Sequence, residues 1–200
     1  MGDKKNYFVD NYSRVDLPTK SVLRDTRGNV VMALEETNLS RIEEIGWQAP
    51  EIFTVKAADD ATDLYGVMWK PFDFDSTKTY PIIAYVYPGP QTEPFPIGFS
   101  LRRVGRTMTL AQVGFVVVAF GQRGGSPLRS KYYHNFGYGD LRDYPLADNK
   151  YGIEQLSARH PFIDLNRVGI HGHSGGGFMS TAALLTYPDF YKVAVSSAGN

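Results

Sequence analysis

One segment determines the architecture of this chain: Val168-Gly-Ile-His-Gly-His-Ser-Gly-Gly-Gly-Phe-Met-Ser-Thr-Ala-Ala183. It opens with a short apolar run at Val168 and Ile170, which is typical of a buried strand. A run of small and apolar residues, Phe178 to Leu185, follows and predicts a helix. Between them lies Gly172-His-Ser-Gly-Gly176, so the segment predicts a strand, a sharp turn and a helix with Ser174 at the apex.

The Gly-x-Ser-x-Gly pattern predicts that Ser174 is a nucleophile. A serine on so sharp a turn has a strained backbone, and the flanking positions must lack side chains that would clash with the strand and the helix. The turn lifts the serine oxygen clear of the sheet, where the first amides of the helix point at it. The alternative is a glycine-rich turn that binds a phosphate or only packs. No Gly-Lys-Ser/Thr and no Gly-x-Gly-x-x-Gly opens a first βαβ unit, so a nucleotide cradle fits less well.

Outward from this segment, apolar runs alternate with helical ones. The expected strands are Ile52–Lys56, Leu64–Lys70, Tyr80–Tyr87, Phe115–Phe120 and Val193–Ser197, and the expected helices are Leu101–Val113 and Leu141–Ala158. This alternation predicts an α/β fold with a mostly parallel sheet and helices on both faces. Between the expected strand Phe115–Phe120 and the expected helix Leu141–Ala158, residues 121–139 form a long loop rich in Gly, Arg and Tyr. Long loops in compact domains tend to be functional.

The first 36 residues differ from the rest of the chain. Short strands are expected at Tyr7–Tyr12, Ser21–Asp25 and Val30–Glu35, the last two joined by the turn at 26–29. Three such strands are marginal alone, so we expect them to belong to a larger β structure. Ser40 and Glu43 have capping-box spacing, which predicts a helical turn within 38–45.

Composition excludes several function classes. The chain has 200 residues and a net charge of zero, from 21 basic and 21 acidic side chains without a long like-charge run. This balance argues against nucleic acid and against an anionic membrane surface as partners. The absence of cysteine excludes disulfides, thiolate chemistry and Cys-type zinc sites. The longest apolar run, Phe115–Phe120, is too short to span a bilayer, and no apolar signal region follows Met1, so the localisation stays open.

Three segments together resemble the catalytic domain of the prolyl oligopeptidase family, in its dipeptidyl peptidase IV-like branch: Asp59 to Asp73, Tyr80-Pro-Ile-Ile-Ala-Tyr-Val-Tyr-Pro-Gly-Pro90, and the Ser174 turn. The resemblance implies an α/β-hydrolase fold and a serine peptidase. In that family the hydrolase domain follows a β-propeller, so residues 1–36 would be the tail of a propeller blade. Residues 37–200 would be the N-terminal part of the catalytic domain, from a parent protein whose location could be periplasmic or secreted.

The resemblance also assigns roles to three residues. Ser174 matches the nucleophile, and Gly175 matches the position whose backbone N–H forms half of the oxyanion hole. Glycine departs there from the tyrosine that is usual in this branch, but a backbone donor does not depend on its side chain. Tyr87 matches the tyrosine whose hydroxyl completes the hole, where one donor can contribute roughly 3 kcal/mol in the transition state. Without the resemblance, Tyr87 would be read as an aromatic residue packing at the end of a strand.

The rest of a catalytic triad is not evident in the sequence. In α/β-hydrolases the acid and then the histidine follow the serine, yet Asp189 is the only acid after Ser174 and no histidine follows His173. We therefore expect both partners to lie beyond Asn200, in a longer peptidase of which this chain is a fragment.

The chain's own histidines are weaker candidates for the base. His173 would diverge from its neighbour, His171 would face other buried side chains, and His160 would lie at a helix end that favours a partly charged imidazole. His134, in the glycine-rich loop, would be the stand-in if one of them served. Arg123 either reaches a substrate carbonyl or carboxylate or holds the loop in place, and the second interpretation is favoured.

Three functions are therefore compared. The first is a serine peptidase acting on peptides or small proteins, most simply by releasing short N-terminal peptides. The second is an esterase or other acyl hydrolase of the same fold, because the serine turn does not distinguish them. The third is a non-catalytic fragment or binding module. No metal or cofactor is implied, and an apolar sheet edge at Val193–Ser196 could pair copies of the chain.

Overall fold

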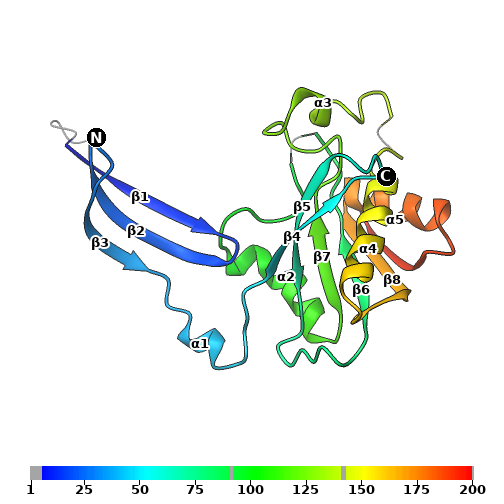
Figure 1. Cartoon of the computed structure of the whole chain (residues 1–200), viewed down its shortest axis with the longest axis horizontal. Coiled ribbons are helices and arrows are strands. Elements are labelled where there is room, and N and C mark those ends of the chain that lie inside the picture. The colour runs from blue at the N-terminus through cyan, green and yellow to red at the C-terminus, as the bar shows by residue number, and fades with distance from the viewer. Residues whose placement is uncertain (1–5, 91, 141–142, 200) are drawn as a thin grey trace.

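The computed structural model describes residues 6–90, 92–140 and 143–199. Its main sheet has the strand order β4-β5-β7-β6-β8-β9. The strands are β4 (Glu51–Lys56), β5 (Asp63–Trp69), β6 (Tyr80–Tyr85), β7 (Val116–Phe120), β8 (Ile163–His173) and β9 (Tyr191–Ser197). β4 and β5 are antiparallel to their neighbours, whereas β7, β6, β8 and β9 run parallel. The predicted α/β fold with a mostly parallel sheet is confirmed (Figure 1).

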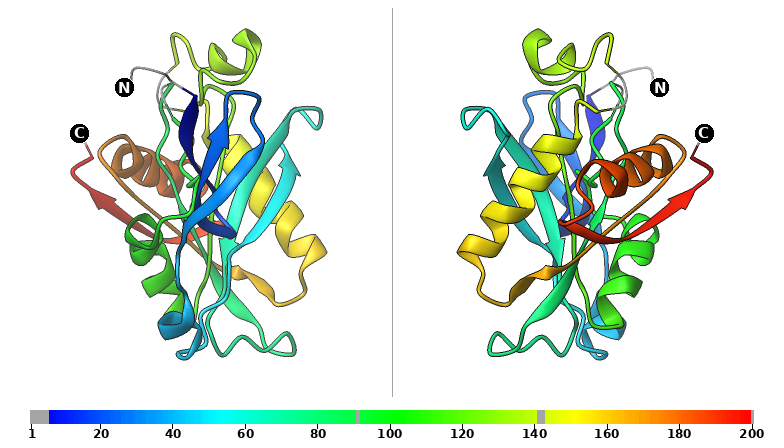
Figure 2. Two further views of the ribbon diagram at one scale, coloured as in Figure 1. Left: turned by 90° about the vertical axis from the view of Figure 1, so that its left-hand side faces the viewer. Right: turned by 90° about the vertical axis from the view of Figure 1, so that its right-hand side faces the viewer.

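Helices cover both faces of this sheet. On one face α4 (Leu146–Arg159) and α5 (Gly175–Thr186) pack, while α2 (Leu101–Gln112) packs on the other. The strand β7 shows why both faces are apolar: Val116 and Val118 belong to the first core, and Val117 belongs to the second with Ala111 of α2. All three valines are fully buried, as expected for a central strand covered on both sides. Figure 2 shows α2 and α4 on opposite sides of the strands.

A separate antiparallel sheet precedes the main one. It consists of β1 (Tyr7–Arg14), β2 (Leu17–Asp25) and β3 (Val30–Glu36), and Figure 1 shows it beside the main sheet. From the turn between β1 and β2, Val15 joins a core cluster with Trp69 and Val117, and Val22 of β2 is also buried. Most of β1 and all of β3 are exposed, which agrees with the expectation that these strands need a further partner. Their assignment to a propeller blade stays a prediction.

The helices differ from the expected ones in three ways: one cap, one starting residue and one additional short helix. The turn α1 (Ser40–Glu43) is present, but the predicted capping box is wrong, because Ser40 is already helical and donates its N–H to Asn38. The expected helix at Leu141–Ala158 begins only at Leu146, after a turn that ends at Pro145; positions 141 and 142 lie outside the described residues. A short helix, α3 (Lys131–His134), interrupts the loop 121–139.

The segment around Ser174 is also longer in regular structure than predicted. β8 extends back to Ile163, and α5 begins at Gly175 rather than at Phe178. Glycines disfavour a helix, but here tertiary packing against β6 and β9 outweighs that preference. In the described part of the chain, no helix combines the length and the apolar character needed to cross a membrane.

Candidate active site

The backbone of Ser174 is strained as the motif predicts. Ser174 has φ 55° and ψ −121°, a region that residues with a side chain rarely occupy, and it sits between the end of β8 and the first turn of α5. Its N–H donates to the carbonyl of Ser197 (2.8 Å), and its carbonyl accepts from Phe178 (3.0 Å). The turn is therefore held from β9 on one side and from α5 on the other.

The glycines on either side of Ser174 are required because the turn lies directly against the backbone at the end of β6. A Cβ on Gly172 would lie 2.4 Å from the carbonyl oxygen of Val86, and one on Gly176 would lie 2.1 Å from the same atom. Both distances are far below van der Waals contact, so neither position accepts a side chain unless the backbone moves. A Cβ on Gly177 would likewise lie 2.6 Å from the carbonyl oxygen of Ser197. The glycines thus allow the helix to start directly against the sheet.

The other two predicted site residues lie beside this turn. Tyr87 follows the end of β6, and its Cα is 3.5 Å from the Cβ position of Gly176. Gly175 is the first residue of α5, where an amide has no acceptor within the helix. A Cβ on Gly175 would be 3.3 Å from the carbonyl of Pro88. The structure therefore brings Ser174, Gly175 and the backbone of Tyr87 together at the carboxyl ends of β6 and β8.

A cavity of about 1060 Å³ opens at this end of the sheet. Tyr87 lines it together with Gly172 and His173 of the turn and with Ser197 at the end of β9. Its other walls are largely aromatic and apolar, from Trp69, Tyr85, Phe95 and Val195 among others, with Glu93 as an acidic member. Ligands of open parallel sheets bind outside the carboxyl ends of the strands, which is where this cavity lies.

Two histidines adjoin the cavity. His173 is exposed, and its Nδ1 lies 3.0 Å from the hydroxyl of Ser197. His171 packs its ring against Tyr85 at 5.2 Å, and burial lowers its pKa. Its Nε2 is buried without a hydrogen-bond partner among the described residues. Neither ring is hydrogen-bonded to the Ser174 hydroxyl in the part of the chain that the structure describes.

The other candidates for triad partners lie elsewhere. His134 bonds to the carbonyl of Gly125 (2.9 Å) within the loop 121–139. His160 ends α4 as predicted, but the expected partly charged imidazole is not supported, because burial lowers its pKa despite Glu51 nearby. Asp189 follows α5, at the end of the helix remote from Ser174. Among the described residues, therefore, no histidine is placed by a hydrogen bond to act as base for Ser174.

Arg123 holds the loop 121–139 in place, as the favoured interpretation has it. Its guanidinium donates to the fully buried Asp148 of α4 (Nη2 to Oδ1, 2.7 Å) and to Asp59 (Nη1 to Oδ2, 3.0 Å). It also lies 4.0 Å above the ring of Phe136. With both carboxylates engaged and only 7% of its surface exposed, Arg123 is committed to the fold and not to a ligand.

Sequence reasoning missed Glu93. Its Oε1 accepts a hydrogen bond from the hydroxyl of Tyr133 (2.9 Å), and its Oε2 is buried without a partner among the described residues. Burial raises the pKa of this carboxyl above its ordinary value, against opposing effects of Tyr133, Arg129 and a hydrogen bond from the backbone of Ser126. The signal that could have found it is that Glu93 is the one acid in the proline-rich segment directly after Tyr87.

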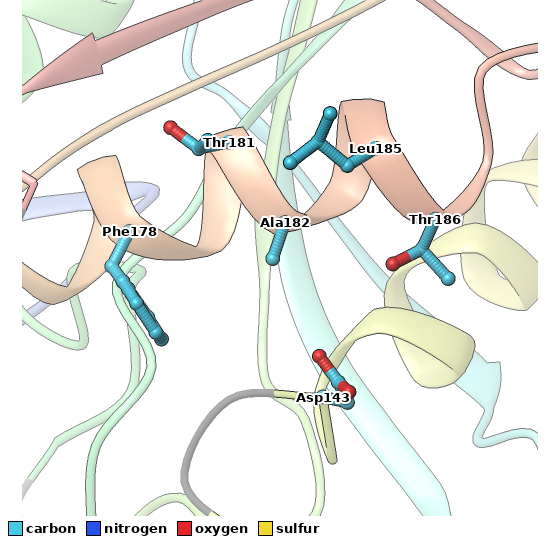
Figure 3. A pocket seen from close by; sticks show the side chains of 6 residues that line it. All are labelled: Asp143, Phe178, Thr181, Ala182, Leu185 and Thr186. Carbon is cyan, nitrogen blue, oxygen red and sulfur yellow. The ribbon is translucent and has the colours of Figure 1, made fainter.

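A second, smaller hollow of about 220 Å³ lies on the outer side of α5 (Figure 3). Five of its residues come from that helix, and the sixth, Asp143, faces them. It contains exposed apolar surface at Leu185, which is 76% exposed, but it has no part of the Ser174 turn among its lining residues. The larger cavity is therefore the better candidate for a substrate site. The described residues contain no group of three or more acidic or histidine side chains placed to hold a metal.

Comparisons with known proteins identify the family of the chain. Residues 102–200 match the model of the family described as "Prolyl oligopeptidase family". The chain is 38% identical to human dipeptidyl peptidase 8 over 149 residues, which are 74% of the chain and 16% of that protein. It is 27% identical to the mouse prolyl endopeptidase FAP over 179 residues, 89% of the chain and 23% of that protein.

Solved structures resemble nearly the whole chain. A crystal structure described as a "putative dipeptidyl aminopeptidase IV" from Bacteroides ovatus has a TM-score of 0.84 and 34% identity, with 97% of this chain and 27% of that one covered. The dipeptidyl peptidase 4 of Porphyromonas gingivalis has the same fold, with a TM-score of 0.79 at 23% identity and the same coverage. The chain thus spans about a sixth to a quarter of the length of these relatives.

Proposed function

The chain belongs to the prolyl oligopeptidase family, and on that basis we propose that it contributes the nucleophile and oxyanion hole of a dipeptidyl-peptidase-type serine peptidase. The observation that carries the proposal is the strained turn at Ser174, which abuts the backbone of Tyr87 and opens α5 at Gly175. A strained backbone of this kind costs conformational free energy, and it is typical of a serine whose oxygen must be presented to a substrate.

The mechanism would be acyl transfer in two steps. The Ser174 oxygen attacks the scissile carbonyl, and its proton passes to a histidine. The carbonyl oxygen, now negatively charged, accepts hydrogen bonds from the Gly175 amide and the Tyr87 hydroxyl. The histidine then protonates the leaving amine, and water releases the acyl group by the same steps in reverse order. Each oxyanion donor would contribute roughly 3 kcal/mol to the transition state.

The histidine and its acid are proposed to come from outside these 200 residues. Two observations support this: the histidine rings of the described residues make no hydrogen bond to the Ser174 hydroxyl, and the curated relatives are several times longer than the chain. The substrate is proposed to be a peptide or small protein with a free amino end, in line with the names of the dipeptidyl peptidases among the relatives. The cavity beside Tyr87 offers aromatic walls for the side chains next to the scissile bond.

Hydrolysis by the full-length protein tests this proposal. A chromogenic dipeptide amide with a free N-terminus should be cleaved, the same compound with an acetylated N-terminus should not, and Ser174→Ala should lose the activity by at least a thousandfold, on the order of the loss seen for a removed catalytic serine. Equal cleavage of an aryl ester and no cleavage of any peptide amide would instead favour an esterase. Unchanged hydrolysis by the Ser174→Ala variant would show that the proposal is wrong.

A further inference from the structure

The segment after Tyr87 has little backbone support of its own. Among described residues 88–99, no amide or carbonyl takes part in a backbone–backbone hydrogen bond. Four prolines, at 88, 90, 94 and 96, remove amide donors from it. Yet this segment begins at Tyr87, whose hydroxyl must be placed to within a fraction of an ångström to serve an oxyanion. Side chains from elsewhere must therefore hold it.

Glu93 makes one such contact, six positions after Tyr87 in the chain. Its carboxylate reaches into the loop 121–139: Oε2 is 2.5 Å from the Cβ position of Gly121 and 3.1 Å from that of Gly125. Any side chain at Gly121 would displace it. Oε1 accepts the hydrogen bond from Tyr133. The carboxylate is largely withdrawn from water, which disfavours its charged form, and the Tyr133 hydroxyl and the backbone of Ser126 offset part of that cost.

Tyr133 is well placed to be a fixed partner. Only 2% of its surface is exposed, and the Arg129 guanidinium lies 4.2 Å from its ring centre. Its carbonyl accepts from the Gly124 amide (2.7 Å), and its own amide donates to Ser130 (3.2 Å). Since Arg123 in the same loop is bonded to Asp148 of α4, the hydroxyl of Tyr133 belongs to a rigid frame. Glu93 therefore ties the proline-rich segment to that frame.

A second phenol supports the other end of the segment. Tyr144 packs between Gly124 and Gly137, whose Cβ positions would be 2.4 Å and 2.6 Å from its ring. Burial raises the pKa of Tyr144 to about 12, against an opposing hydrogen bond from the backbone of Gly89. Gly89 is two residues after Tyr87 and has φ 151°, so the turn there depends on glycine.

From these contacts we propose that Tyr133, acting through Glu93, is a positioning residue for Tyr87: the Tyr133–Glu93 hydrogen bond fixes the segment that presents the Tyr87 hydroxyl to the oxyanion. This inference rests on the proposed function, because it assigns Tyr87 to the oxyanion hole. It predicts that removing the Tyr133 hydroxyl slows the reaction of Ser174 only while Tyr87 keeps its own hydroxyl. If Tyr133 had a structural role alone, its removal would slow the reaction equally whether or not Tyr87 has its hydroxyl.

A double-mutant cycle on the full-length protein separates these two cases. The rate constant for labelling by a fluorophosphonate is measured for the wild type, Tyr133→Phe, Tyr87→Phe and the double variant. Tyr133→Phe should slow labelling about five- to tenfold in the wild-type background and less than about twofold in the Tyr87→Phe background. Tyr132→Phe is the matched control, because Tyr132 adjoins Tyr133 in the chain but is itself 70% exposed. This variant should be labelled as fast as the wild type.

Variants of Glu93 extend the test. Glu93→Ala should slow labelling as Tyr133→Phe does, whereas Glu93→Gln should restore most of the rate, because an amide oxygen still accepts from Tyr133. An equal loss from Tyr133→Phe in both Tyr87 backgrounds, or no loss in either, would overturn the inference.

Failure of the proposed function can be told apart from failure of this inference. A wild-type protein that takes no label would refute the proposal that Ser174 is activated. Hydrogen–deuterium exchange of peptides covering 88–99 would then test, by itself, whether the Tyr133–Glu93 contact holds this segment. Faster exchange in Tyr133→Phe than in Tyr132→Phe supports the contact as the one that holds the segment. Identical exchange in the two variants overturns it.

Discussion

At the scale of single residues, the site depends on close approaches that leave no room for a Cβ. The carbonyl of Val86 lies against both Gly172 and Gly176, and the backbone of Ser174 is bent into a positive φ to join them. Two hydrogen bonds hold this strained backbone: the Ser174 N–H donates to the Ser197 carbonyl, and the Phe178 N–H donates to the Ser174 carbonyl. The conformation of Ser174 and the stability of this turn are therefore set by the same few atoms.

The first prediction concerns the two glycines after Ser174. Gly176→Ala should destabilise the fold by about 1–3 kcal/mol, because its Cβ would lie 2.1 Å from the Val86 carbonyl. Gly175→Ala is the control, since its nearest neighbour is the Pro88 carbonyl at 3.3 Å. Urea unfolding of the purified variants measures both. A Gly176→Ala variant as stable as Gly175→Ala would contradict the close approach.

The second prediction concerns the protonation of Glu93. Burial raises the pKa of this carboxyl in the folded chain above the ordinary 4.5, so the folded state binds the proton more tightly than the unfolded state does. Stability therefore falls as the pH rises from 4.5 through the folded-state pKa. Glu93→Gln removes this loss, so its stability relative to the wild type should be greater near neutral pH than below pH 4.5.

Unfolding experiments at these two pH values check the second prediction. Glu44→Gln, at an exposed position, is the control and should change stability equally at both. A Glu93→Gln variant whose advantage does not grow with pH would show that the carboxyl is not desolvated in the way described.

Part of the site could be predicted from sequence at this scale. Ser174 and its glycines were found because their steric requirement is local and confined to five consecutive residues. Tyr87 required a family resemblance, since a tyrosine at the end of a strand has no distinguishing local signal. Glu93 and Tyr133 were missed because their hydrogen bond joins an irregular segment to the short helix α3, 40 positions away, and no periodicity reports such a contact.

At the scale of elements, the loop 121–139 is positioned by charge. Arg123 is held between Asp148 of α4 and Asp59 of the turn between β4 and β5. Burial acts to raise the pKa of Asp59, but hydrogen bonds from Thr62 and Ala61 together with Arg123 lower it to about 2. One arginine thus connects three elements that are far apart in the sequence.

The third prediction is that Asp148→Asn destabilises the chain by about 3 kcal/mol. The side chain of Asp148 is fully buried, and its loss would leave a 7% exposed Arg123 with Asp59 as its remaining ion-pair partner. Asp73→Asn, on the exposed surface, should have little effect on unfolding. If the two variants unfolded at the same denaturant concentration, the buried ion pair would not be what holds this loop.

The fourth prediction concerns the edge strand β9, which has β8 as its neighbour in the described sheet. Val193 and Val195 are 56% and 59% exposed, and an apolar edge of this kind can pair with another copy of the chain. We expect the 200-residue chain to self-associate, and Val193→Lys to reduce that association. Val113→Lys, which adds the same charge at a 68% exposed site outside the sheet, should not. Analytical ultracentrifugation distinguishes these outcomes, and a monomer at all concentrations would refute the expectation.

The type and order of the elements were predictable, whereas several boundaries were not. Alternating apolar and helical runs gave the strands of the main sheet and their mostly parallel arrangement. The start of α5 at Gly175 was missed because glycine has low helix propensity, and only contact with the Val86 and Ser197 carbonyls reveals why glycines are needed there. The start of α4 was placed too early because apolar spacing alone does not reveal the turn that ends at Pro145.

At the scale of the whole molecule, two sheets of different character share one small contact. The three-stranded sheet meets the rest of the chain through Val15, which packs on the main sheet, and through Ser13, which accepts from the amide of Phe99 (3.2 Å) in the segment before α2. Apolar side chains on β1 and β3, such as Val9 and Met32, remain exposed in the described part of the chain. The sequence indicated the different character of these strands, but where they dock depends on two residues that no pattern marks.

The central claim is that Ser174 is the activated nucleophile of a larger serine peptidase. The most direct measurement is the intact mass of the full-length protein after reaction with a fluorophosphonate, with Ser174→Ala treated in parallel. The account predicts one adduct per chain in the wild type and none in the variant. An unmodified wild type, or an adduct that persists in Ser174→Ala, would contradict it.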